Sequence, residues 1–191
     1  MIQDIFPHRF NNLYLANKSI GENDFILHYN GDSLLLKVSG DEFEIPKRKD
    51  FPEISDKTEV TFLFTLNDTP GFIIWDKLKE ENSNFIYKEI SLFRAIMPKA
   101  IAWVSIVGFQ LMSWYSHTKV CGKCGSRTQK KPAERAIVCP HCNTTIYPKI
   151  SPAIIVAIVC NDKLLLARNS NFSGTWFSLI AGYADVGESL E

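Results

Sequence analysis

The chain has 191 residues, a length that suits one or two domains. Hydrophobic residues make up 46% and charged residues 22%, which excludes a disordered tail, a collagen-like fibre and a disulfide-dense mini-protein. The formal net charge is zero, with 21 Lys and Arg against 21 Asp and Glu, which excludes a generally basic protein that coats nucleic acid.

The neutral total hides a segregation of charge along the chain. Residues 1–118 have a balance of −4, residues 119–150 a balance of +6, and residues 151–191 a balance of −2. This pattern predicts three units, of which the short middle one attracts anions.

The first part of the chain reads as β-structure, because short apolar runs alternate with turn residues. Asn30-Gly31-Asp32 separates two of these runs and is typical of a hairpin turn, since Asn and Gly tolerate positive φ. A second turn cluster is Asn67-Asp68-Thr69-Pro70. The expected strands are residues 24–29, 33–38, 42–45, 59–66, 71–75 and 84–88.

The hydrophobic period changes to three and four residues across residues 100–115, which predicts a helix with Pro98 in its first turn. The apolar run is shorter than the ~20 residues that a membrane span needs, so we expect a buried helix whose aromatic side chains lie in the core. The first ten residues lack the apolar stretch of a signal peptide. We therefore expect a cytoplasmic protein without a membrane partner.

Four of the five cysteines form two Cys-x-x-Cys pairs separated by fourteen residues: Cys121, Cys124, Cys139 and Cys142. Zinc prefers thiolate ligands in a tetrahedron, and this doubled spacing is typical of a zinc ribbon. Redox-active pairs and unrelated buried thiols are the alternatives, but a redox pair usually occurs singly. Four cysteines leave no open metal position, so the zinc would be structural. His117 and His141 are expected at the surface.

The chain after residue 150 begins with a run of β-branched residues, which predicts a central strand over residues 152–159. A second strand is expected over residues 163–168. Cys160 follows the first run and is interpreted as a small buried hydrophobe.

Gly182, five further residues and Glu188 resemble the opening of a Nudix box. A four-cysteine ribbon followed by Ser-Pro-Ala-Ile-Ile-Val-Ala-Ile and Ala-Gly-Tyr is similar to the zinc-ribbon branch of the Nudix superfamily, the NADH pyrophosphatases or NAD-capped RNA hydrolases. The resemblance implies an α+β fold. Its expected parts are a β-rich Nudix-like domain at 1–117, a zinc ribbon at 118–150, and the beginning of an α/β/α Nudix domain at 151–191.

Members of this family hydrolyse the pyrophosphate of NAD(H) to nicotinamide mononucleotide and AMP with Mg²⁺ or Mn²⁺, and the resemblance also implies a homodimer. It assigns Glu134 and Tyr147 to the substrate nucleotide and the carbonyl of Ala181 to the catalytic metal. Gly182 and Glu188 match the first fixed positions of the box. The remaining metal carboxylates of the box have no counterpart among these 191 residues, so the chain by itself is expected to be inactive.

Other interpretations of the same residues stay open. Glu134 could simply offset its basic neighbours Lys130, Lys131 and Arg135, and Tyr147 could be a packing residue. The basic ribbon could also serve as an RNA- or nucleotide-binding module without catalysis. The specificity motif that marks the NADH branch follows the box and is not present in these residues.

Overall fold

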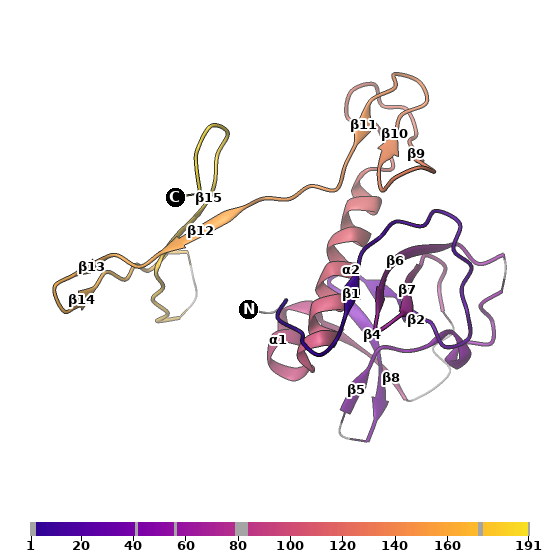
Figure 1. The fold of residues 1–191 in the computed structure, drawn as a ribbon, viewed down its shortest axis with the longest axis horizontal. Helices are drawn as coiled ribbons and strands as arrows, with labels where there is room; N and C mark the ends of the chain where they lie inside the picture. The colour runs from indigo at the N-terminus through magenta and orange to yellow at the C-terminus, as the bar shows by residue number, and fades with distance from the viewer. Residues whose placement is uncertain (1–2, 41, 56, 79–83, 172–173, 191) are drawn as a thin grey trace. The chain divides into compact units, whose positions relative to one another are not determined.

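The computed structural model describes residues 3–40, 42–55, 57–78, 84–171 and 174–190. It divides into two compact units, Met1–Pro148 and Lys149–Glu191 (Figure 1). Among the described residues no helix is long and apolar enough to cross a membrane.

Two four-stranded sheets form the first part of the Met1–Pro148 unit. One has the order β1-β6-β7-β2, and in the other β4 pairs with β3, β5 and β8. Most pairs are antiparallel, but β2 runs parallel to β7. The first sheet contains β1 (Phe10–Asn11), β2 (Phe25–Leu27), β6 (Val60–Leu66) and β7 (Thr69–Ile74), and the second contains β3 (Tyr29–Asn30), β4 (Ser33–Ser39), β5 (Glu42–Glu44) and β8 (Phe85–Glu89).

The expected strand over residues 24–29 is divided between the two sheets. Gly31, at φ +56°, turns β3 into β4 as the sequence predicts, whereas β2 leaves this hairpin and joins β7. The division follows because this segment is buried on both of its faces. Ile26 and Leu27 are consecutive and fully buried, and they belong to different hydrophobic clusters. The strand segment therefore lies between two cores, which a period-two pattern does not reveal.

The predicted turn between β6 and β7 is present. Asn67 and Asp68 both have positive φ, 50° and 67°, as a tight two-residue hairpin requires. The strand after the turn begins at Thr69 and includes Pro70, slightly earlier than the apolar run indicates.

Helix α2 (Lys99–His117) confirms the predicted helix. It packs against the first sheet and contributes side chains to the larger hydrophobic core. Pro98 is its N-cap residue rather than part of its first turn, and the Pro98 carbonyl accepts the N–H of Ala102. The shorter helical segments η1 (Arg48–Asp50), η2 (Ile90–Leu92) and α1 (Phe93–Ile96) lie in the connections. Trp114 and Tyr115 are buried at the end of α2, where the ribbon strands follow (Figure 1).

The Lys149–Glu191 unit consists of two small strand pairs. β12 (Ala153–Val156) pairs with β15 (Ile180–Tyr183), and β13 (Val159–Cys160) pairs with β14 (Lys163–Leu164). None of its described residues, 149–171 and 174–190, is buried. The expectation of a buried central strand over residues 152–159 is therefore wrong here, and Cys160 is exposed rather than buried. Among the described residues β12 has one neighbouring strand and no covering helix, so its apolar side chains remain at the surface.

The close approach of α2 to the strands gives a test of the packing. A Cβ at Gly108 would lie 2.5 Å from Leu27 Cδ2 and 2.5 Å from Tyr29 Oη. Neither atom can move freely, because Leu27 is fully buried and the Tyr29 hydroxyl donates a 2.8 Å hydrogen bond to the carbonyl of Ser105.

We expect Gly108→Ala to lower the free energy of unfolding, although alanine is the better helix former by about 1 kcal/mol. Overpacking and the strained hydrogen bond cost about 1–3 kcal/mol. Urea unfolding measures the difference. The control is Gly21→Ala, where the nearest atoms to an added Cβ lie at 3.5 Å. Stabilisation by Gly108→Ala would show that this contact is not tight.

Candidate functional site: a metal ribbon and the residues it positions

A small three-stranded sheet follows directly after α2. Its order is β11-β10-β9, with all pairs antiparallel, and its strands are β9 (Gln129–Lys130), β10 (Ile137–Val138) and β11 (Thr145–Ile146). The helix ends where Thr118 caps it, with its N–H and hydroxyl both donating to the carbonyl of Trp114. The ribbon therefore begins from a fixed point on the helix.

Each cysteine pair lies in a tight loop, and the two loops have the same hydrogen bonds. The N–H of Gly125 donates to the Cys121 carbonyl, and the N–H of Asn143 donates to the Cys139 carbonyl, both at 2.9 Å. Gly125 and Asn143 have positive φ, 75° and 57°. Glycine and asparagine tolerate this conformation at the lowest cost.

The four sulfur atoms lie within 4.8 Å of one another. Cys121 Sγ is 3.6 Å from Cys142 Sγ, and Cys124 Sγ is 3.5 Å from Cys139 Sγ. A tetrahedron with Zn–S bonds of about 2.3 Å has edges of about 3.8 Å. The arrangement of the thiols therefore fits one structural zinc ion.

The surroundings of Cys124 and Cys142 favour the thiolate form that zinc needs, whereas burial and hydrogen bonds with the neighbouring thiols raise the pKa of Cys139 to about 11. Hydrogen bonds from the backbone N–H and the hydroxyl of Ser126 lower the pKa of Cys124 to about 5. Hydrogen bonds from the hydroxyl and the backbone of Thr144 lower the pKa of Cys142. His117 and His141 are exposed, as expected, and neither belongs to the sulfur cluster.

Several polar contacts attach the ribbon to the N-terminal part of the chain. The Arg135 guanidinium donates to the carbonyl of Leu63 in β6 at 2.5 Å and lies 5.6 Å from the centre of the Tyr14 ring. The Tyr14 hydroxyl donates to the Lys131 carbonyl at 3.1 Å. The Lys130 amine donates to the Thr61 hydroxyl at 2.6 Å. The ribbon and β6 are thus connected by charge-assisted and aromatic contacts.

The two residues that the resemblance assigns to the substrate nucleotide are in contact. The Tyr147 hydroxyl donates to Glu134 Oε1 at 3.2 Å, and the Lys131 amine lies 2.5 Å from the same oxygen. The hydrogen bond from Lys131 lowers the pKa of Glu134, which stays ionised. The Tyr147 side chain is 56% exposed, so its ring is available to a ligand.

Of the three basic neighbours considered for Glu134, the described contacts pair it with Lys131 alone. Lys130 is directed to Thr61 and Arg135 to Leu63. The Glu134–Tyr147 contact depends on a turn between β9 and β10 and on the end of β11, and neither the sequence spacing nor the charges indicate it.

The partial box lies in the other unit. Ala181 and Gly182 belong to β15 and pair with Ile155 and Ile154 of β12. Glu188 follows in a turn, where its carboxylate accepts the N–H of Asp185 at 2.8 Å and its own N–H donates to the Asp185 carbonyl at 3.1 Å.

This turn has half of a helix capping box, in which a glutamate reaches back to the N–H three residues earlier. Asp185 was not recognised from the sequence. The Asp-x-x-Glu spacing that it forms with Glu188 is the signal that could have identified it.

The fold and the metal centre define a Nudix-like domain followed by a four-cysteine zinc ribbon. Residues 23–114 match the NADH pyrophosphatase-like rudimentary NUDIX domain, and residues 116–147 match the NADH pyrophosphatase zinc ribbon domain. Together these matches cover more than half of the chain. The chain belongs to the NADH pyrophosphatase family with a zinc ribbon.

Several relatives carry the name NAD-capped RNA hydrolase NudC. The protein from Stutzerimonas stutzeri is 34% identical over 156 residues, which cover 76% of this chain and 51% of the relative. The Pseudomonas aeruginosa protein is 40% identical over 82 residues, 43% of this chain and 30% of its own length. The Shigella flexneri protein is 42% identical over 84 residues, which cover 44% of this chain and 33% of the relative. The chain thus spans about half, or less, of the length of these curated relatives.

The sulfur cluster predicts one zinc ion per chain. Cys124→Ser removes a thiolate ligand and should release zinc and unfold the ribbon, because zinc binding and folding are coupled in such sites. Cys160→Ser is the matched control, since Cys160 is exposed and outside the cluster. Elemental analysis and a colorimetric zinc assay measure the zinc content of the two variants. Loss of zinc from the Cys160 variant, or its retention in the Cys124 variant, would contradict the assignment.

Proposed function

We propose that the protein acts on the pyrophosphate group of NAD(H). In this reaction a water oxygen bonds to one phosphorus, the P–O–P bond breaks, and nicotinamide mononucleotide and AMP leave with release of a proton. The observation that carries the proposal is the Glu134–Tyr147 pair on the zinc ribbon of a chain in the NADH pyrophosphatase family. The ionised Glu134 carboxylate can accept a hydrogen bond from an amide or amine of a nucleotide. The exposed Tyr147 ring can stack on the flat ring of that nucleotide.

NAD-capped RNA is included in the proposed substrate class. The relatives are named for this substrate, and an NAD cap carries the same pyrophosphate as the free dinucleotide. The balance of +6 over residues 119–150 supports an attraction for the RNA backbone, because neutralising phosphates releases counterions.

We propose separate roles for the partial box. Glu188 orients the start of the box helix through its bond to the N–H of Asp185, Gly182 is the first fixed position of the box and lies within β15, and Ala181 offers a carbonyl to Mg²⁺ or Mn²⁺. When bound, such a metal neutralises phosphate charge and activates water. A homodimer, on the family resemblance, and a cytoplasmic location are also proposed.

A binding titration tests the role of Tyr147. Removing the ring with Tyr147→Ala should weaken NADH binding about tenfold or more, because base–aromatic stacking contributes about 1–3 kcal/mol. Tyr147→Phe keeps the ring and should bind nearly as well. NADH fluorescence measures both. Equal affinity of the Ala variant and the unchanged protein would exclude this site.

The role of Glu134, the acidic partner of Tyr147, is tested with Glu42 as the control. Glu134→Gln removes the ionised acceptor and should weaken NADH binding, whereas Glu42→Gln changes an exposed carboxylate on β5 and should not.

A comparison of NAD-capped and uncapped RNA separates the enzyme from the non-catalytic RNA module. Tighter binding of the capped strand supports the proposal. Equal binding of both strands, lost after charge reversal at Lys130 and Lys131, supports the module instead.

The 191 residues alone should not hydrolyse NADH in the presence of Mg²⁺ or Mn²⁺. The carboxylates that the family uses to hold the metal have no counterpart among these residues. Release of AMP, followed by chromatography, measures the activity, and a chain that continues through a complete box is the positive control. Turnover by the 191-residue chain at a rate similar to that control would sink this part of the proposal.

A further inference from the structure

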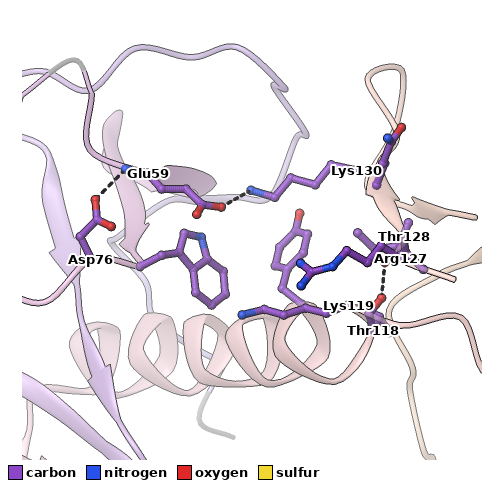
Figure 2. A pocket seen from close by; sticks show the side chains of 11 residues that line it. Glu59, Asp76, Thr118, Lys119, Arg127, Thr128 and Lys130 are labelled. Atoms are coloured by element: carbon purple, nitrogen blue, oxygen red, sulfur yellow. Dashed lines mark hydrogen bonds and ion pairs between the residues drawn. The ribbon is translucent and has the colours of Figure 1, made fainter. Parts of the chain in front are cut away.

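A second feature of the Met1–Pro148 unit is a pocket between the N-terminal strands, the end of α2 and the ribbon. Its volume is about 430 Å³. This falls in the ordinary range of small-molecule sites. Its lining includes Glu59, Trp75, Tyr115, Lys119, Arg127 and Lys130. Figure 2 shows their side chains around a common space.

Two aromatic rings form a rigid wall of the pocket. The rings of Trp75 and Tyr115 are 6.3 Å apart and nearly perpendicular, at 87°. The Trp75 indole N–H donates to the Thr61 hydroxyl at 2.8 Å, which fixes the ring. Burial raises the pKa of Tyr115 to about 12, so its phenol stays neutral and adds no negative charge.

Three cations lie against this wall. The Lys119 amine is 5.5 Å from the centre of the Trp75 ring, and the Lys130 amine is 5.5 Å from the centre of the Tyr115 ring. Lys130 also lies 4.0 Å from a Glu59 carboxylate oxygen. Within the described part of the chain, Lys119 and Arg127 have no carboxylate partner. Figure 2 shows both of these side chains directed toward the rings.

The pocket is therefore polarised. Unpaired cations come from the ribbon side, and the carboxylates of Glu59 and Asp76 lie on the strand side, where the N–H of Glu59 donates to Asp76 at 3.0 Å. A ligand that fits has an anionic group at one end and a flat ring with hydrogen-bond donors at the other.

We propose that this pocket binds a nucleotide, with its phosphate between Lys119 and Arg127 and its base against the aromatic wall. An exocyclic amine of the base would donate to Glu59 or Asp76. Arginine and lysine form charge-assisted hydrogen bonds with phosphate, and aromatic side chains accept any base. The nucleotide can be free or part of an RNA strand, since both present the same chemistry.

This site goes beyond the proposed function, because it is separate from the Glu134–Tyr147 pair. Lys130 and Lys131 are consecutive, yet their amines contact different partners, Thr61 on one side and Glu134 on the other. The two sites thus lie on either side of one short ribbon segment.

Calorimetric titration of the zinc-loaded 191-residue protein tests the proposal without any hydrolysis. The probes are AMP, a 5′-phosphorylated penta-adenylate without a cap, and inorganic phosphate. Lys119→Gln and Arg127→Gln should each weaken AMP binding about tenfold, since a hydrogen bond to a charged group contributes about 1.5–3 kcal/mol. Arg127→Lys should retain part of the affinity.

The control variants separate this pocket from other sites. Lys57→Gln removes an exposed lysine outside the pocket and should leave AMP binding unchanged. The AMP titrations are repeated in the Tyr147→Ala background, which removes the proposed NADH site, so failure here and failure of the proposed function are distinguishable. Zinc content and circular dichroism verify that each variant is folded.

The probes distinguish the source of the nucleotide. Similar affinity for AMP and the oligonucleotide indicates a pocket for one nucleotide, and tighter binding of the oligonucleotide indicates an RNA strand. Two results would overturn the proposal: inorganic phosphate binding as tightly as AMP, or AMP binding that is absent or is unchanged by both Lys119→Gln and Arg127→Gln.

Discussion

The geometry of the ribbon depends on four thiolates that share one zinc ion. Its three strands are two residues long each, and between residues 119 and 147 the buried side chains are only Cys121, Ala136, Ile137 and Cys139. So few apolar groups cannot offset the conformational entropy of nearly thirty residues. Zinc contributes about 10–16 kcal/mol in small zinc-finger peptides, which is enough to fold such a segment.

The metal site positions a set of charged side chains that point to different partners. Lys130 and Arg135 contact the N-terminal strands, while Lys131 contacts Glu134 and, through it, Tyr147. The same short segment therefore attaches the ribbon to the Nudix-like domain and presents two different groups of polar atoms. The basic charge that the sequence concentrates in residues 119–150 is distributed over both groups.

Features with a local cause could be predicted from the sequence. The Cys-x-x-Cys spacing identified the metal ligands, the three- and four-residue period identified α2, and the cluster Asn67-Asp68-Thr69-Pro70 identified a turn. Each depends on residues that are close together in the chain, so spacing and backbone preference are sufficient.

Features that depend on distant residues were missed or misjudged. The division of residues 24–29 between two sheets arises because Ile26 and Leu27 face separate cores. The apolar run at residues 152–159 indicated burial, but burial requires a covering element, and the described part of that unit provides none. The pocket joins Trp75, Tyr115 and Arg127 from three parts of the chain, and nothing in their spacing indicates that they meet.

Zinc removal tests most directly whether the metal positions the ligand-binding residues. The binding of NADH and of AMP would be titrated on the zinc-loaded protein, on the protein after chelation, and after zinc is restored, with circular dichroism following α2 and the sheets. We predict that both affinities fall at least tenfold without zinc, that the helix signal is largely retained, and that zinc restores binding. Undiminished binding of both ligands by the zinc-free protein would contradict it.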